Sequence, residues 1–198
     1  MLHGFPDTAH TWDDLRPRSA AAGFRAVSPF MRGYHPSAIP PRDADQETLA
    51  RGPLALVETL GARDAVLIGH DWGAAAAYGA AAIGPDRVKK LFVIGIPHPA
   101  ALKPSLKKLW GVRHFAAYKL PGAPKRFARN DFAALPAIYR RWSPDLATRS
   151  TGVRRRPGQL LQPGQLERGV RLLPKTLPHP QRITEDANHR TGGCLCRP

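Results

Sequence analysis

One segment near the middle of the chain combines an apolar run, a tight glycine turn and an alanine-rich stretch. Val66, Leu67 and Ile68 precede the pattern Gly-x-Asp-x-Gly at residues 69–73, and four alanines follow at 74–77. A short apolar run of this kind is typical of a strand buried on both faces of a parallel sheet. The segment therefore predicts a strand that turns directly into a helix, with Asp71 at the turn.

The types of residue found around Asp71 follow from the geometry of the predicted turn. In so tight a turn, side chains two positions before and after Asp71 would collide, which accounts for Gly69 and Gly73. The N-terminus of the following helix points at Asp71, and its free N–H groups and dipole favour a carboxylate there. Taken alone, the short pattern fits a catalytic turn and also an ordinary strand–helix turn in which Asp71 only caps the helix.

The rest of the first hundred residues alternates strand-like and helix-like stretches. Short apolar runs predict strands at Phe24–Ser28, Ala65–Ile68 and Lys90–Ile94. Polar starts and glycine stops predict helices at Thr11–Ala22, Gln46–Leu60 and Trp72–Ile83. This alternation is typical of βαβ units and predicts the α/β class, with a parallel sheet flanked by helices.

Two changes in composition divide the chain. Residues 1–96 form the predicted α/β core, and residues 97–148 are interrupted by prolines, helical in character and typical of a lid. Within that lid, Pro136 predicts that residues 131–142 form a kinked helix or two short ones. Residues 149–198 hold no Phe, Tyr, Trp or Met, so we expect a mostly disordered basic tail.

Charge and cysteine content exclude several classes of protein. The net charge of +15 is spread over the chain, because residues 1–148 carry 20 basic and 12 acidic side chains and residues 149–198 carry 10 and 3. With no nucleic-acid-binding motif, we predict a solvated basic surface and no specific nucleic-acid partner. Cys194 and Cys196 make neither a structural disulfide nor a metal site. No membrane span or signal peptide is evident, which predicts a cytoplasmic protein.

Three further motifs stand in a fixed order around the Asp71 turn. His3-Gly4-Phe5-Pro6 lies upstream of it, Met31-Arg32-Gly33-Tyr34-His35-Pro36-Ser37 follows the first predicted strand, and Ile96-Pro97-His98-Pro99 lies where the lid departs. Together with the turn, these motifs resemble the α/β-hydrolase fold family, in the branch with an aspartate nucleophile that includes epoxide hydrolases and haloalkane dehalogenases. The resemblance covers residues 1–148 and implies a partial α/β-hydrolase.

The resemblance implies roles for individual residues. Asp71 is the nucleophile that forms an alkyl-enzyme ester, and the backbone N–H groups of Phe5 and Trp72 form the oxyanion hole. His114 stands where the family has a lid tyrosine, so it is either a proton donor or a solvent-facing lid residue. The remaining motif residues shape the site: His3, Gly4, Pro6, Gly69, His70 and Gly73. The mechanism implies no metal and no cofactor.

The resemblance leaves three functions open. An epoxide hydrolase, which releases a diol, is favoured because the dehalogenases commonly have Asn at the place of Phe5. The second is a haloalkane dehalogenase, which acts on an alkyl halide. The third is an inactive remnant, because the family's C-terminal histidine base and its acid partner have no counterpart here. We therefore expect a chain truncated at both ends, whose composition break near Arg149 is typical of an out-of-frame continuation. Oligomeric state is not predicted.

Overall fold

A small parallel sheet forms the centre of the protein. The computed structural model describes residues 1–34, 36–38, 45–98, 101, 122, 126 and 129–143. Strand β1 (Ala65–His70) pairs in parallel with β2 (Val88–Ile94), with Leu67 opposite Leu91. On the other edge of β1, Leu2 forms a single parallel bridge to Gly69. The predicted strands at 65–68 and 90–94 are confirmed, and with them the α/β class.

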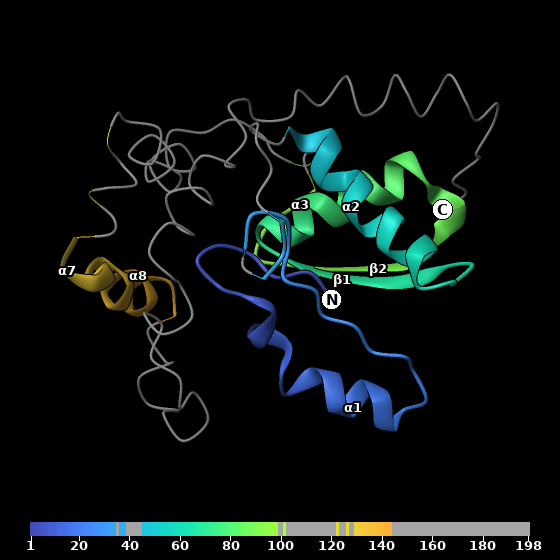
Figure 1. The fold of residues 1–198 in the computed structure, drawn as a ribbon, viewed down its shortest axis with the longest axis horizontal. Helices are drawn as coiled ribbons and strands as arrows, with labels where there is room; N and C mark the ends of the chain where they lie inside the picture. The colour runs from blue at the N-terminus through green and yellow to red at the C-terminus, as the bar shows by residue number, and fades with distance from the viewer. Residues whose placement is uncertain are drawn as a thin grey trace.

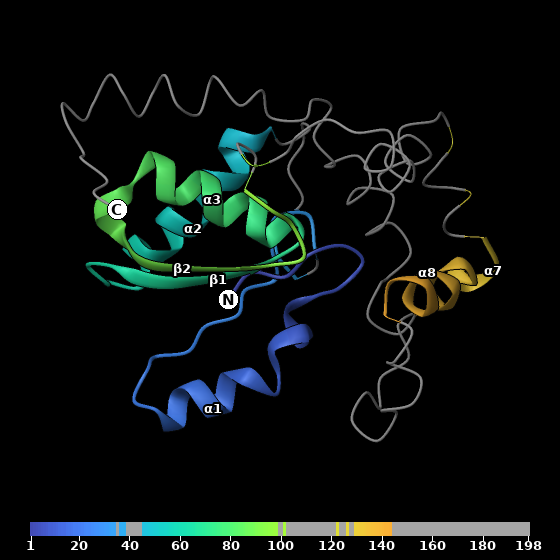
Figure 2. The ribbon, with the colours of Figure 1, turned by 180° about the vertical axis from the view of Figure 1, so that it is seen from behind.

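Two helices cover one face of this sheet. Helices α2 (Gln46–Thr59) and α3 (Trp72–Ile83) lie together on one side, and α1 (Leu15–Ala21) lies on the other (Figures 1 and 2). A short 3-10 helix, η2 (Pro85–Arg87), leads from α3 into β2. The crossover from β1 through α3 to β2 is thus the predicted βαβ unit, and the helices predicted at 46–60 and 72–83 are confirmed.

Small residues allow α3 to pack closely against its neighbours. Four alanines of this helix have no exposed surface: Ala74, Ala76, Ala77 and Ala80. On the α2 side, a side chain at Gly79 would begin 2.6 Å from the Cβ of Ala50. Larger side chains on α3 would separate the two helices and lift α3 from the sheet, so this composition places the start of α3 directly behind the end of β1.

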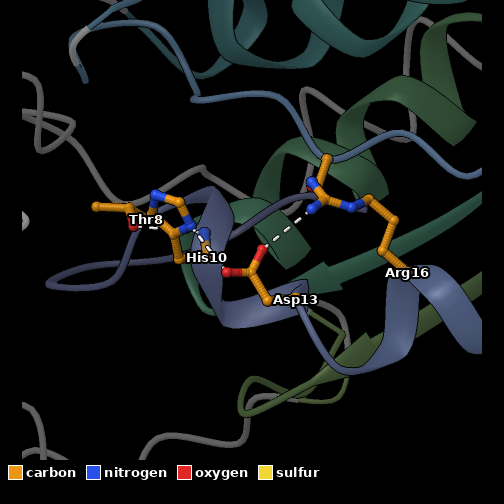
Figure 3. Close-up of polar contacts among 5 residues, drawn as sticks. Thr8, His10, Asp13 and Arg16 are labelled. Atoms are coloured by element: carbon orange, nitrogen blue, oxygen red, sulfur yellow. Dashed lines mark hydrogen bonds and ion pairs between the residues drawn. The ribbon is translucent and has the colours of Figure 1, made fainter. Parts of the chain in front are cut away.

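The start of the helix predicted at Thr11–Ala22 is wrong, because the helix begins further along the chain. Thr8 caps a 3-10 helix, η1 (Ala9–Trp12), by accepting a hydrogen bond from the His10 backbone N–H at 3.4 Å. Helix α1 starts only at Leu15. Between the two, Asp13 accepts from His10 Nδ1 at 2.9 Å and from Arg16 at 3.3 Å (Figure 3). Because Asp13 binds side chains at this corner, it does not support the first turn of one continuous helix.

The strand predicted at Phe24–Ser28 is also wrong, because this segment is extended but belongs to no sheet among the described residues. Its described neighbour is the start of the chain, where the Met1 ammonium donates to the Val27 carbonyl at 2.8 Å. A parallel ladder needs successive N–H and C=O partners along its length. Phe24 consequently leaves 60% of its surface exposed.

Two short helices represent the predicted lid. Helix α7 (Arg129–Phe132) and helix α8 (Ala134–Trp142) meet at Ala133. Two short helices are therefore confirmed in this stretch, but the break lies at Ala133 and not, as predicted, at Pro136. Pro136 lies in the first turn of α8, where it interrupts no hydrogen bond of the helix. The rest of the predicted lid, apart from a few single residues, and the whole predicted tail, 149–198, lie outside the described residues.

Candidate active site

Asp71 occupies a strained position between β1 and α3. Its backbone has φ 50° and ψ −117°, a conformation that residues with a side chain rarely adopt and that costs of the order of 1–3 kcal/mol. The surrounding structure holds it there, because the Asp71 N–H donates to the Ile94 carbonyl at 3.1 Å and its carbonyl accepts from Ala74 at 2.9 Å. The Asp71 side chain does not cap α3, which argues against the interpretation of Asp71 as a simple helix cap.

Three glycines allow the backbone segments around Asp71 to meet. A Cβ on Gly69 would lie 2.5 Å from the Gly73 carbonyl oxygen, and a Cβ on Gly73 would lie 2.2 Å from the Leu2 carbonyl oxygen. A Cβ on Gly4 would lie 2.4 Å from the Asp71 Cβ. The steric reason given for Gly69 therefore holds, since its neighbour across the turn is Gly73. At Gly73 a side chain is excluded for a second reason, which is the close contact with the N-terminal segment.

A loop of residues 3–7 brings a hydrogen-bond donor to the Asp71 carboxylate. The Phe5 backbone N–H donates to Asp71 Oδ2 at 2.9 Å, and the Phe5 side chain is buried. At the first residue of α3, the Trp72 N–H also favours the charged form of Asp71. The two groups predicted as oxyanion donors, on Phe5 and Trp72, thus converge on Asp71 from segments far apart in the sequence.

His3 fixes the start of this loop and has no exposed surface. Its Nε2 accepts from the Met31 N–H at 3.0 Å, so the proton is on Nδ1, which donates to the Gly4 carbonyl at 3.1 Å. The Tyr34 ring packs edge-on against it, with ring centroids 4.5 Å apart. Burial lowers the pKa of His3 to about 4, so the ring is neutral near neutral pH. This geometry agrees with a role for His3 in shaping the loop.

Burial controls the electrostatics of Asp71. Desolvation raises the pKa of the Asp71 carboxyl, and the nearby charge of Asp7 raises it further. The N–H groups of Phe5 and Trp72 act in the opposite direction, as does His70. The result is a carboxyl group that is partly removed from water but still held by backbone donors, an environment that differs from that of a solvated surface acid.

One contact joins helix α8 to this site. The Tyr139 hydroxyl of α8 donates to Asp7 Oδ1 at 2.5 Å. Asp7 was not among the site residues predicted from the sequence. A signal for Asp7 was present, because it follows His3-Gly4-Phe5-Pro6 directly. For Tyr139 no signal existed, since nothing in the sequence brings position 139 to position 7.

The other histidines lie at different places. The His70 ring packs directly against Gly95, where an added Cβ would lie 3.2 Å from His70 Cδ2. The His98 ring packs edge-on against Tyr78, with centroids 4.9 Å apart. His114, the predicted lid proton donor, lies outside the described residues, as does His35.

Two features are absent from the part of the chain that the structure describes. In these parts of the chain no group of three or more His, Cys, Asp or Glu side chains is arranged to hold a metal ion. Over the same residues, none of the helices is both long enough and apolar enough to cross a membrane.

Comparison with known proteins assigns this arrangement to a family. A family model described as alpha/beta hydrolase fold matches residues 1–165. An epoxide hydrolase of Caballeronia sordidicola is 44% identical over 100 residues, which cover 49% of this chain and 30% of that protein. An AB hydrolase superfamily protein of Bacillus subtilis is 35% identical over 68% of this chain and 50% of its own length. Epoxide hydrolase 4 of Mus musculus is 31% identical over 81% of this chain and 44% of its own length.

Solved structures agree with this on the fold. The structure of the Bacillus megaterium epoxide hydrolase with an inhibitor matches with a TM-score of 0.71 at 23% identity, over 86% of this chain and 63% of that one. The epoxide hydrolase CorEH matches with a TM-score of 0.69 at 24% identity, over 86% and 63%. The chain spans half or less of the length of the three curated relatives described above. By this family match the chain belongs to the α/β-hydrolase fold family, and the relatives that it resembles include epoxide hydrolases.

Proposed function

We propose that this chain carries the nucleophilic site of an epoxide hydrolase, with Asp71 as the nucleophile. The observation that carries the proposal is the strained Asp71 turn, where a partly buried carboxylate accepts from the Phe5 N–H at 2.9 Å. The names of the relatives in Caballeronia and mouse support epoxides as the substrate class.

In the first step, Asp71 attacks an sp³ carbon of the epoxide ring. Its Oδ2 is held by the Phe5 N–H, which leaves Oδ1 to act as the attacking atom. A bond forms between Oδ1 and the carbon, the ring C–O bond breaks, and its electron pair stays on the epoxide oxygen, which then takes up a proton. His114 is the proposed donor of that proton by resemblance. A carboxylate suits displacement at sp³ carbon because the product is an ester that water can later cleave.

In the second step, water attacks the carbonyl carbon of the Asp71 ester. The negative charge develops on Oδ2, where the N–H groups of Phe5 and Trp72 stabilise it. Collapse of this intermediate breaks the bond between the carbonyl carbon and Oδ1. Oδ1 takes up a proton and leaves as one hydroxyl of the diol, and the water oxygen replaces it in the restored Asp71 carboxylate. A base must take the proton from the water. A chain without that base stops at the ester, which is the outcome expected of an inactive remnant.

Intact-mass spectrometry after incubation with styrene oxide tests the proposal. A nucleophilic Asp71 gives an adduct with the full mass of one epoxide, which peptide mapping places on Asp71, or gives diol. In water labelled with heavy oxygen, complete turnover places the label in the Asp71 carboxyl group. Asp71→Asn abolishes both signals, whereas Asp13→Asn, the same change at an exposed acid, keeps them.

The outcomes separate the three functions. Turnover to diol with label in Asp71 supports an epoxide hydrolase, and a persistent ester on Asp71 supports a remnant that performs the first step only. Halide release from a chloroalkane without diol formation from the epoxide favours a dehalogenase. Equal alkylation of wild type and Asp71→Asn refutes the assignment of Asp71 as nucleophile.

A further inference from the structure

The loop of residues 3–7 is held at both of its ends. At the start, the buried ring of His3 binds the Gly4 carbonyl and the Met31 N–H. At the end, Asp7 accepts from the Tyr139 hydroxyl at 2.5 Å, a bond between residues 132 positions apart. Hydrogen bonds from a hydroxyl to a carboxylate are shorter and roughly twice as strong as those between neutral groups. The contact of α8 with Asp7 is therefore a firm attachment.

The position of Asp7 connects this contact to Asp71. Asp7 lies two residues after Phe5, whose backbone N–H contacts Asp71 Oδ2 at 2.9 Å. Without its bond to Tyr139, the end of the segment loses one of its attachments, and the Phe5 N–H can shift with it. The strength of a hydrogen bond falls steeply as the angle at the hydrogen departs from linearity, so a small displacement of Phe5 weakens its bond to Asp71.

We propose that Tyr139 and Asp7 form a positioning pair, through which lid helix α8 holds the Phe5 N–H in line with the Asp71 carboxylate. Neither residue touches the reacting atoms in this role. The consequence for catalysis rests on the proposed function of Asp71, but the consequence for the loop does not. The pair makes part of the site depend on the lid, so the donor is correctly placed only while α8 is in contact with the loop.

The protonation state of the pair is suited to this role. Burial raises the pKa of Tyr139, and the charge of Asp7 raises it further. The phenol therefore keeps its proton and remains a donor across the neutral pH range. The nearby ring of Tyr34 is similarly held in its neutral form, because burial and the charges of Asp71 and Asp7 raise the pKa of Tyr34.

Hydrogen exchange at the Phe5 amide measures the positioning directly and needs no activity. Tyr139→Phe removes only the hydroxyl and keeps the ring, and Asp7→Asn removes the charge of the acceptor. In each variant we expect the Phe5 amide to exchange roughly tenfold faster or more, the loss that corresponds to one hydrogen bond to a charged group. The double variant is expected to exchange no faster than Tyr139→Phe alone, because both changes act on the same hydrogen bond, which Asn at position 7 weakens and Phe at position 139 removes. Tyr78→Phe is the matched control, since that ring contacts His98 and not Asp7.

The rate of ester formation on Asp71 provides the second measurement. In Tyr139→Phe we expect the limiting rate at saturating styrene oxide to fall roughly tenfold, with little change in the half-saturating concentration, because a displaced Phe5 N–H no longer orients the carboxylate so that Oδ1 faces the epoxide carbon. Unchanged exchange at Phe5 in both Tyr139→Phe and Asp7→Asn overturns the inference. If wild type forms no ester, the proposed function fails, and the exchange result still decides whether the pair positions the loop. Urea unfolding of each variant separates loss of positioning from loss of fold.

Discussion

Replacing Gly73 by alanine tests whether the N-terminal segment is locked against the Asp71 turn. An added Cβ at this position would lie 2.2 Å from the Leu2 carbonyl oxygen and 2.6 Å from that of His3. Both atoms belong to the backbone, so no side chain can rotate away to make room. The segment must move outward, and Leu2 is bound to β1 by two backbone hydrogen bonds, to Ile68 at 2.7 Å and to His70 at 3.0 Å.

The expected loss of stability follows from three contributions. Forcing a methyl group into a packed contact costs about 1–3 kcal/mol. Weakening two backbone hydrogen bonds costs about 0.5–1.5 kcal/mol each. Alanine is the better helix former by about 1 kcal/mol, which offsets part of this loss. We therefore expect Gly73→Ala to lower the free energy of unfolding by about 3 kcal/mol, a large fraction of the 5–15 kcal/mol that is typical of a folded domain.

Urea unfolding followed by circular dichroism measures this change. Gly52→Ala is the matched control, because a Cβ at Gly52 in α2 would have no atom within 4 Å. The same substitution should there raise the free energy of unfolding by about 0.5–1 kcal/mol. Gly73→Ala with wild-type stability would show that the N-terminal segment yields freely, and would refute the steric explanation of this glycine.

Three further changes test the electrostatics. Burial lowers the pKa of His3 to about 4, so the fold favours the neutral ring. We expect the free energy of unfolding to fall by roughly 3 kcal/mol as the pH falls from about 6.5 through about 4. Calorimetry across this pH range measures the loss, and His3→Gln should give a flatter profile. Burial raises the pKa of Asp71, so the charged carboxylate destabilises the fold above that pKa. Asp71→Asn should therefore raise the melting temperature near neutral pH. In acid, where Asp71 is protonated, the two proteins should melt at the same temperature. Arg51→Ala breaks an exposed ion pair with Glu47, and the free energy of unfolding should change by no more than about 0.5 kcal/mol.

The turn at Asp71 was predictable from the sequence because its requirements are local. A short apolar run, two glycines and a row of alanines restrict the backbone within a dozen residues, and β1 and α3 form where these patterns place them. The loop at His3 was recognisable only by its resemblance to a family motif. Its bond from Phe5 to Asp71 joins residues 66 positions apart, a distance that local patterns do not encode.

The sequence by itself determined the strand–turn–helix unit and its acid, because steric exclusion and apolar periodicity act between near neighbours. Only the tertiary structure decided that Phe24–Ser28 belongs to no described strand, since a strand depends on partners along its whole length. The same holds for the strain at Asp71, which its neighbours impose, and for Asp7 and Tyr139, which have no local reason to meet. The position of Asp71 at the turn is thus determined by its own segment, whereas the groups that surround it are brought there by contacts from the whole described fold.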